Sequence, residues 1–312
     1  MQELQKPIFI VGCPRSGTTI LASLLNNHSQ IASATEMHFF NYISKQKKYN
    51  WGKLDKQSLT MLLDESRIID FCTHGNLDKN TLLDALLAAP STDKKTIFTI
   101  LANNFIASKN KFRFCEKTPQ HLLNVEEILN IFPDAKIIYL VRDGRDTVNS
   151  LMKMPWRPQG LLNNSRFWKQ YVTIGTRLQN KYSSQPQSFK TIKYEDLLTL
   201  PKQTLKEICQ FIELPYEESL SKQNENVFSE WEASWKHKAS EELDSTRIGA
   251  WQKELSDQDQ ILINWHLSKS LKALGYDVKQ VKLAFGDSLR LGIEYSSLSF
   301  NKVVRSFADV IN

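Results

Sequence analysis

The chain has 312 residues, of which 41% are apolar and 24% are charged. This composition is typical of a folded globular protein and excludes a collagenous or largely disordered chain. With 40 basic and 34 acidic residues the net charge is +6, which is a mild bias toward anionic ligands. The basic residues are spread along the whole sequence, whereas nucleic-acid-binding proteins more often carry a dense basic stripe. We therefore expect no nucleic acid among the partners.

The cysteines form no CxxC pair, and their spacing to histidine does not suit zinc. They are Cys13, Cys72, Cys115 and Cys209. Reduced thiols in the cytoplasm are the simplest interpretation. The apolar stretch at 8–11 is too short for a signal sequence, and no stretch approaches the roughly 18 apolar residues of a membrane span. The sequence thus predicts a cytoplasmic chain with no membrane span and no metal.

Short apolar segments alternate with helical patterns along the chain. The predicted strands are 8–11, 113–115, 136–141 and 188–193. Helices are predicted at 19–26, after Thr118 and Pro119 as N-cap and first residue, at 146–154, and from Pro201. The first and third strands are apolar on both faces, which suits strands buried between helices. The pattern predicts an α/β fold in three layers, with a central, mainly parallel sheet flanked by helices.

Residues 1–280 are predicted to form one domain of this kind. Within it, 41–110 is a mostly helical insertion, whose role is left open between covering a substrate pocket and adding to the packing. A further amphipathic helix is predicted at 261–274, ended by Gly275. Residues 281–312 are expected to be a C-terminal extension.

A loop bounded by glycines follows the first predicted strand, in the sequence IFIVGCPRSGTT at 8–19. Loop amides and a helix N-terminus in this arrangement bind phosphate. A Walker A loop, GxxxxGK[ST], would match Gly12 and Gly17, but Thr18 stands at the lysine position. Because that lysine neutralises the phosphates of a nucleoside triphosphate, its absence argues against phosphoryl transfer. The loop is P-loop-like, keeps a cation in Arg15, and suits a less charged sulfuryl group.

A second motif is IIYLVRDGRDTVNS at 137–150. Arg142 lies at the carboxyl end of a predicted strand, and Ser150 lies about two turns into the next helix. Ligands bind at the carboxyl edge of an open α/β sheet, and an arginine with a nearby hydroxyl can hold a second phosphate there. The alternative is a surface arginine paired with Asp143 or Asp146.

Together and in this order, the two motifs resemble the family of sulfotransferases that use 3'-phosphoadenosine 5'-phosphosulfate (PAPS). The resemblance runs from residue 7 to about 276 and is closest to the bacterial and tyrosylprotein branch. It implies that the loop holds the 5'-phosphosulfate and that Arg142 and Ser150 hold the 3'-phosphate. The loop residues are Pro14, Arg15, Ser16, Gly17, Thr18 and Thr19.

Two later motifs are also similar to the family. YEDL at 194–197 resembles a strand-end motif whose tyrosine, here Tyr194, lies near the adenosine. TRIGAW at 246–251 resembles the loop that closes over the 3'-phosphate, although it is shorter than in the tyrosylprotein branch. This implies nucleotide contacts for Ser245, Arg247 and Gly249, while Trp251 is expected to belong to the core.

Sulfuryl transfer to an alcohol or phenol needs cations that stabilise the charge on the leaving nucleotide. Arg15 and Lys117 are the predicted cations. Lys117 follows the predicted strand at 113–115, at the same sheet edge as the loop, and it matches the lysine after the second strand of the family. The alternative for Lys117 is a surface pair with Glu116.

The acceptor hydroxyl also needs a base. The hormone and phenol branch has a histidine two residues after the family lysine, where this chain has Pro119. The chain resembles instead the branches with a glutamate about twenty residues after the loop arginine, which assigns Glu36 as the base. His38 and His121 are the reserve candidates.

The leading hypothesis is therefore metal-independent sulfuryl transfer from PAPS, with adenosine 3',5'-bisphosphate as product, to a hydroxyl of a carbohydrate, a small molecule or a tyrosine. An atypical P-loop kinase or ATPase and a non-catalytic nucleotide-binding protein are the alternatives. The insertion and the segment 154–168 are the expected walls of the acceptor site. Aromatic and basic residues of that segment are Trp156, Arg157, Arg166 and Trp168. A homodimer is left open.

Overall fold

A computed structural model of the chain describes residues 2–157, 160–221, 244–279 and 281. These residues form two compact units, one within Met1–Val141 and Ile174–Asp244, the other within Arg142–Thr173 and Ser245–Asn312. Each unit is described by itself. The C-terminal extension predicted at 281–312 lies outside the described residues apart from Val281, and the one-domain boundary at 280 stays a prediction.

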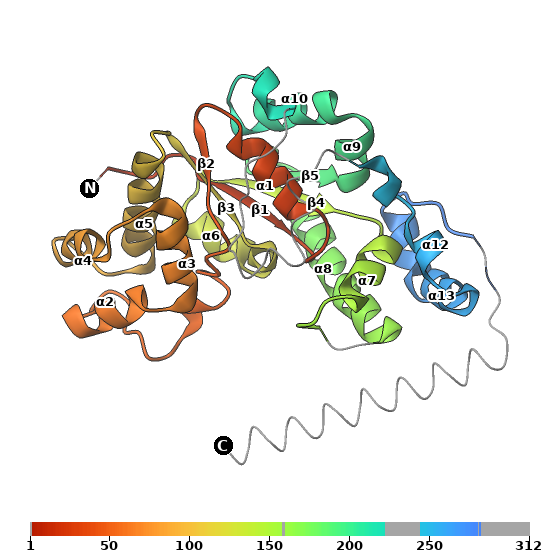
Figure 1. Cartoon of the computed structure of the whole chain (residues 1–312), viewed down its shortest axis with the longest axis horizontal. Helices are drawn as coiled ribbons and strands as arrows, with labels where there is room; N and C mark the ends of the chain where they lie inside the picture. Colours follow the sequence, from red (N-terminus) through yellow and green to blue (C-terminus); the bar gives the residue numbers. More distant parts are fainter. Residues whose placement is uncertain (1, 158–159, 222–243, 280, 282–312) are drawn as a thin grey trace, which may run out of the picture. The chain divides into compact units, whose positions relative to one another are not determined.

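The first unit contains a parallel sheet with the strand order β2-β3-β1-β4-β5 (Figure 1). Its strands are β1 (Ile8–Gly12), β2 (Ile31–Ser33), β3 (Arg113–Lys117), β4 (Lys136–Val141) and β5 (Phe189–Lys193). Every residue of β1 and β4 is buried, as expected for strands covered on both faces. The four predicted strands are confirmed, and β2 is an additional strand of three residues.

Helices connect these strands. After β1 comes α1 (Thr18–Asn26), and between β2 and β3 come η1 (Ile43–Lys45), α2 (Lys56–Leu63), α3 (Ser66–Gly75), α4 (Lys79–Leu87) and α5 (Lys94–Ser108). In Figure 1 the orange helices α2 to α5 gather into one group. Three of these four helices begin at an aspartate whose carboxylate accepts a backbone N–H of the first turn. The predicted insertion is thus helical, and its role as a substrate cover stays a prediction.

The remaining helices in the described part of this unit follow β3, β4 and β5. They are η2 (Pro119–Asn124), α6 (Val125–Ile131), the last part of α8 (Leu161–Lys181), α9 (Tyr194–Thr199), α10 (Pro201–Ile212) and η3 (Glu218–Ser221). Pro201 opens α10 as predicted. Thr118 is the N-cap of η2 and Pro119 its first residue, as predicted, but the Thr118 hydroxyl donates to Glu116 and caps no helix N–H.

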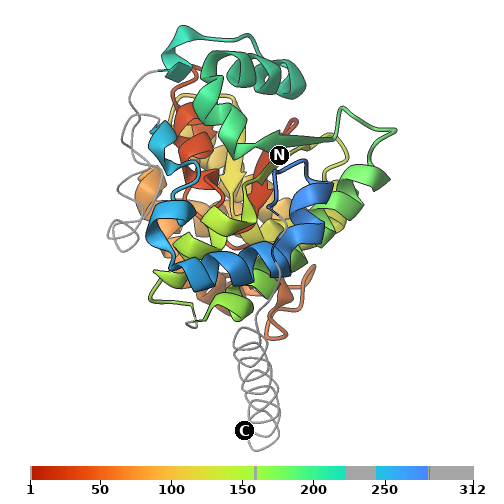
Figure 2. The same ribbon diagram turned by 90° about the vertical axis from the view of Figure 1, so that its right-hand side faces the viewer.

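The described residues of the second unit form helices and the loops between them. The helices are α7 (Gly144–Met152), the first part of α8, η6 (Ser245–Arg247), α12 (Trp251–Glu254) and α13 (Asp257–Ala273). Both α12 and α13 pack against α7 (Figure 2). A Cβ on Gly144 would lie within 2.9 Å of Trp168 and Leu267, so only glycine permits this close packing. Among the described residues of either unit, no helix has the length and apolarity needed to cross a membrane.

The parallel sheet fixes the place of the candidate site. Because all five strands run in one direction, their carboxyl ends lie along one edge. In the first unit this edge carries the loop after β1, the segment after β2, Lys117 at the end of β3, and Tyr194 directly after β5. The next residue after β4 is Arg142, the first residue of the second unit.

Candidate active site

The loop after β1 has the backbone of an anion-binding turn. Arg15 and Gly17 both have positive φ, at 73° and 93°, and the Ser16 N–H donates to the Cys13 carbonyl at 3.1 Å. Gly17 is the N-cap of α1, so the first N–H groups of this nine-residue helix end at the loop. The Ser16 hydroxyl is buried and has no hydrogen-bond partner among the described residues. These features fit a bound oxyanion.

Tyr194 packs directly on this loop. A Cβ added to Gly17 would lie 2.3 and 2.5 Å from Cδ2 and Cε2 of the Tyr194 ring, and the tyrosine is only 1% exposed. The ring therefore holds the loop in place at its helix end. The family resemblance implies a tyrosine near the adenosine, and the structure adds this contact with the loop glycine.

Glu36 and Lys117 lie together at the same sheet edge. Lys117 ends β3 with a fully buried side chain, and its Nζ donates to Glu36 Oε1 at 2.7 Å. The other carboxylate oxygen of Glu36 lies 3.2 Å from His38 Nε2. Because the Asn41 amide nitrogen can only donate to His38 Nδ1, at 3.1 Å, the Nε2 proton of His38 faces Glu36. The predicted base and cation thus form an ion pair, and Lys117 is not a surface residue paired with Glu116.

His121, the second reserve base, is engaged elsewhere. The backbone N–H of Phe40 donates to its Nε2 at 3.1 Å, and its Nδ1 lies 2.8 Å from Glu116 Oε2. The ring is fully buried. Both ring nitrogens face protein groups, so neither is available to take a proton from an acceptor.

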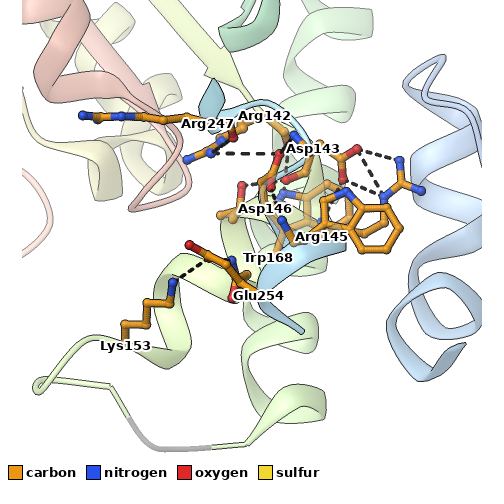
Figure 3. A network of polar contacts seen from close by, with 12 residues as sticks. Arg142, Asp143, Arg145, Asp146, Lys153, Trp168, Arg247 and Glu254 are labelled. Atoms are coloured by element: carbon orange, nitrogen blue, oxygen red, sulfur yellow. Dashed lines mark hydrogen bonds and ion pairs between the residues drawn. The ribbon is translucent and has the colours of Figure 1, made fainter. Parts of the chain in front are cut away.

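The second unit carries the residues that the resemblance implies for the 3'-phosphate, and Figure 3 shows the contacts of Arg142 and Arg247 among them. Arg142 donates through Nη2 to the Arg247 carbonyl at 2.9 Å and lies 4.0 Å from Asp146 Oδ2. Asp146 in turn accepts the N–H groups of Gly249 and Trp251 at 2.8 and 3.0 Å. Burial raises the pKa of Asp146, while Arg142 and the two N–H groups act in the opposite direction.

A second buried network lies beside it in the same unit. Arg145 pairs with Asp143 at 2.6 Å, and it also donates to Asn264 Oδ1 at 2.9 Å. Its guanidinium lies 4.5 Å from the ring of Trp251, and Trp251 is buried as predicted. This network fixes the start of α7 on α12 and α13 and gives Asp143 a close partner in Arg145.

The other predicted residues of this unit differ in exposure. Ser150 is half-buried on α7, and Ser245 is exposed in η6. Of the expected acceptor walls, Trp168 is fully buried and donates to the Arg142 carbonyl at 3.3 Å, so it packs within the unit. Trp156 is 43% exposed, and Arg157 stacks on Phe167 at 3.9 Å. Trp156 and Arg157 stay candidates for acceptor contacts.

The sequence reasoning missed two carboxylates that organise these groups. Asp146 was considered only as a partner of Arg142, yet it also fixes the backbone at Gly249 and Trp251. Glu116 was considered only as a partner of Lys117. One of its oxygens accepts the N–H of Met37, 79 positions earlier in the chain, and no local pattern signals such a pairing.

The sequence matches the sulfotransferase family over residues 7–218, which is more than half of the chain. The chain belongs to the sulfotransferase family. The predicted membership is thereby confirmed, and the family offers no support for the kinase or ATPase alternative. The match includes the phosphate loop, Glu36, Lys117, Arg142 and Tyr194.

Among similar proteins, a protein-tyrosine sulfotransferase of Drosophila melanogaster is 24% identical over 216 residues, which are 68% of this chain and 39% of that protein. Protein-tyrosine sulfotransferase 1 of Homo sapiens is 24% identical over 223 residues, which are 70% of this chain and 54% of that protein. The chain thus aligns with about half or less of the length of these two relatives.

Solved sulfotransferase structures share the fold. The sulfotransferase domain from the Curacin biosynthetic pathway superimposes with a TM-score of 0.62 and 22% identity, covering 89% of this chain and 100% of that domain. The sulfotransferase domain of the Synechococcus PCC 7002 olefin synthase gives a TM-score of 0.65 at 17% identity, covering 89% and 98%. The predicted P-loop-like α/β fold is therefore confirmed.

Proposed function

We propose that this sulfotransferase-family chain transfers a sulfuryl group from PAPS to a hydroxyl acceptor, with Glu36 as the base. The observation that carries the proposal is the Glu36–Lys117 ion pair, 2.7 Å long, at the carboxyl edge of the sheet that also carries the phosphate loop. A buried lysine beside a carboxylate whose side chain is 11% exposed supplies a cation and a proton acceptor in one place. Membership in the sulfotransferase family supports the same reaction class.

The donor requires two anion sites. The loop at 14–19 is proposed to hold the 5'-phosphosulfate, because the Ser16 hydroxyl is buried without a partner in the described part of the chain and the N-terminus of α1 attracts an anion. In the second unit, the residues proposed to contact the 3'-phosphate are Arg142, Ser150, Ser245, Arg247 and Gly249. In the first unit, Tyr194 is proposed to lie near the adenosine. Thr18 in place of a Walker lysine agrees with a donor that needs no magnesium.

Glu36, Lys117 and Arg15 are proposed to act together in a single displacement step. Glu36 accepts the proton of the acceptor hydroxyl as the acceptor oxygen forms its bond to sulfur. The bond between sulfur and the bridging oxygen of the 5'-phosphate breaks, and adenosine 3',5'-bisphosphate leaves with the electron pair. Lys117 and Arg15 stabilise the negative charge that develops on this oxygen. His38, at 3.2 Å from Glu36, holds the second carboxylate oxygen.

The acceptor is proposed to be a tyrosine, a carbohydrate hydroxyl or a small-molecule hydroxyl. Two similar proteins are named protein-tyrosine sulfotransferases, which favours testing tyrosine first. A cytoplasmic location and a homodimer both stay predictions.

The proposal is tested with sulfur-labelled PAPS in buffer that contains a metal chelator. A tyrosine peptide, 4-nitrophenol and a glucosamine oligosaccharide serve as acceptors. The wild-type chain is expected to label at least one of them, and Glu36→Gln is expected to slow labelling roughly 100-fold or more, since general base catalysis contributes about 10²–10⁴ in rate. Equal rates for Glu36→Gln and the wild type would contradict Glu36 as the base.

A further inference from the structure

The segment that carries Glu36 has little regular structure of its own. After β2 ends at Ser33, residues 34–38 belong to no helix or strand. His38 has a positive φ of 53°, which a residue with a side chain adopts only when its surroundings hold it there. The orientation of the Glu36 carboxylate therefore depends on what binds this backbone.

Three side chains from the end of β3 and from η2 bind it. The Met37 N–H donates to Glu116 Oε1 at 3.2 Å, and the His38 N–H donates to Thr118 Oγ1 at 3.3 Å. The Phe40 N–H donates to His121 Nε2 at 3.1 Å. Buried backbone N–H groups need such partners, and here they come from a part of the chain about 80 residues away.

The three side chains are also joined to one another. The Thr118 hydroxyl donates to Glu116 Oε1 at 2.5 Å, and His121 Nδ1 lies 2.8 Å from Glu116 Oε2. All three residues are fully buried. Because the Phe40 N–H can only donate, His121 Nε2 must accept, and the ring proton lies on Nδ1. Nδ1 and Glu116 Oε2 are close but do not meet hydrogen-bond geometry, so Glu116 is hydrogen-bonded to Thr118 and in close contact with His121.

We propose that Glu116, Thr118 and His121 form an amide clamp that positions Glu36 against Lys117 for proton abstraction. Glu116 is adjacent to Lys117 on β3, so one strand end holds both the backbone at Met37 and the carboxylate of Glu36. His121 is a positioning residue in this arrangement and exchanges no proton with the acceptor. The proposal rests on the proposed function, since it assigns Glu36 the role of base.

The test variant is His121→Phe. Phenylalanine retains the edge-on packing of the ring on Phe9 and Phe40, whose centroids lie 6.2 and 5.5 Å away, but it provides no hydrogen-bonding nitrogen. Hydrogen exchange of peptides covering 34–41 should become faster, while that of the loop at 12–19 stays unchanged. With the acceptor labelled by the wild type, kcat should fall about 10- to 100-fold, the scale of a small misplacement of a catalytic group, with KM for PAPS unchanged.

Two variants serve as controls. His28 is another fully buried histidine of the same unit, whose Nε2 lies 2.9 Å from the Pro215 carbonyl. His28→Phe makes the same replacement away from Glu36 and should lower stability while kcat and exchange at 34–41 stay at wild-type values. His121→Gln restores an acceptor for the Phe40 N–H and should recover most of the rate.

A double variant separates positioning from general damage. In the Glu36→Gln background, His121→Phe should slow turnover no further, because the base it positions is already absent. Three results would each overturn the clamp. They are an unchanged hydrogen-exchange rate at 34–41 in His121→Phe, faster exchange there with an unchanged kcat, and a further loss of kcat when His121→Phe is added to Glu36→Gln. An inactive wild type, or a Glu36→Gln variant of full activity, would instead overturn the proposed function, and the exchange result would still decide whether His121 holds the segment.

Discussion

Replacing Gly17 with alanine should damage the phosphate loop in two separable ways. Gly17 has a φ of 93°, and a side chain at such a left-handed position costs about 1–2 kcal/mol. The new Cβ would also lie 2.3 and 2.5 Å from the ring carbons of Tyr194. Tyr194 is buried, so its ring cannot move into open space, and overpacking of this kind costs about 1–3 kcal/mol.

Gly52 offers a matched control within the same unit. Its φ is 92°, and an added Cβ would meet nothing within 4 Å. Gly52→Ala therefore loses only the free energy of the strained backbone. The difference in free energy of unfolding between the two variants then measures the clash with Tyr194. We expect Gly17→Ala to lower the free energy of unfolding by about 1–3 kcal/mol more than Gly52→Ala does.

Urea unfolding of the two variants measures this difference, and titration with adenosine 3',5'-bisphosphate measures the effect on the loop. Gly17→Ala should weaken nucleotide binding, whereas Gly52→Ala should not. Adding Tyr194→Leu to Gly17→Ala should recover part of the lost stability, because the smaller side chain makes room for the methyl group. Equal destabilisation by the two alanines would refute the idea that the tyrosine holds the loop.

Two further predictions concern charge. Arg142→Ala should weaken binding of adenosine 3',5'-bisphosphate about 10- to 150-fold, the equivalent of about 1.5–3 kcal/mol for a charge-assisted contact. Affinity for ADP, which lacks the 3'-phosphate, should hardly change in calorimetry, and an equal loss for both would place the 3'-phosphate elsewhere. Hydrogen bonds from Lys136 and Lys6 lower the pKa of Glu213 from 4.5 to about 2, so this carboxylate stabilises the fold above pH 4.5 and stops doing so as the pH falls to about 2. Glu213→Gln should flatten the loss of stability over that range in urea unfolding, and an unchanged pH dependence would contradict the assignment.

Local sequence signals predicted most of the fold. Apolar runs on both faces marked β1 and β4, and the loop glycines marked the turn into α1, because these features depend on a few neighbouring residues. The strand β2 was missed because three residues, Ile-Ala-Ser, are too few to show a period. The helix α13 begins at Asp257, four residues before the predicted start at 261, and its N-cap is Ser256. The prediction began too late because the first turn of this helix is polar and adds nothing to the apolar pattern.

For the candidate site, the sequence predicted which residues belong to it and their order along the chain, but not their contacts. Lys117 was placed at the sheet edge from the strand pattern and Glu36 was assigned from the family resemblance, and the structure pairs them. Their supports could not be predicted. The contact of Asp146 with Gly249 joins residues 103 positions apart, and the contacts of Glu116 depend on how a segment without regular structure folds back on β3.

Calorimetric titration with adenosine 3',5'-bisphosphate, in the absence of metal and beside ATP with and without magnesium, tests the central claim most directly. The proposed donor predicts binding of the bisphosphate at micromolar concentration or tighter without metal. Binding of ATP only in the presence of magnesium, with no binding of the bisphosphate, would contradict the assignment of the loop and of the reaction.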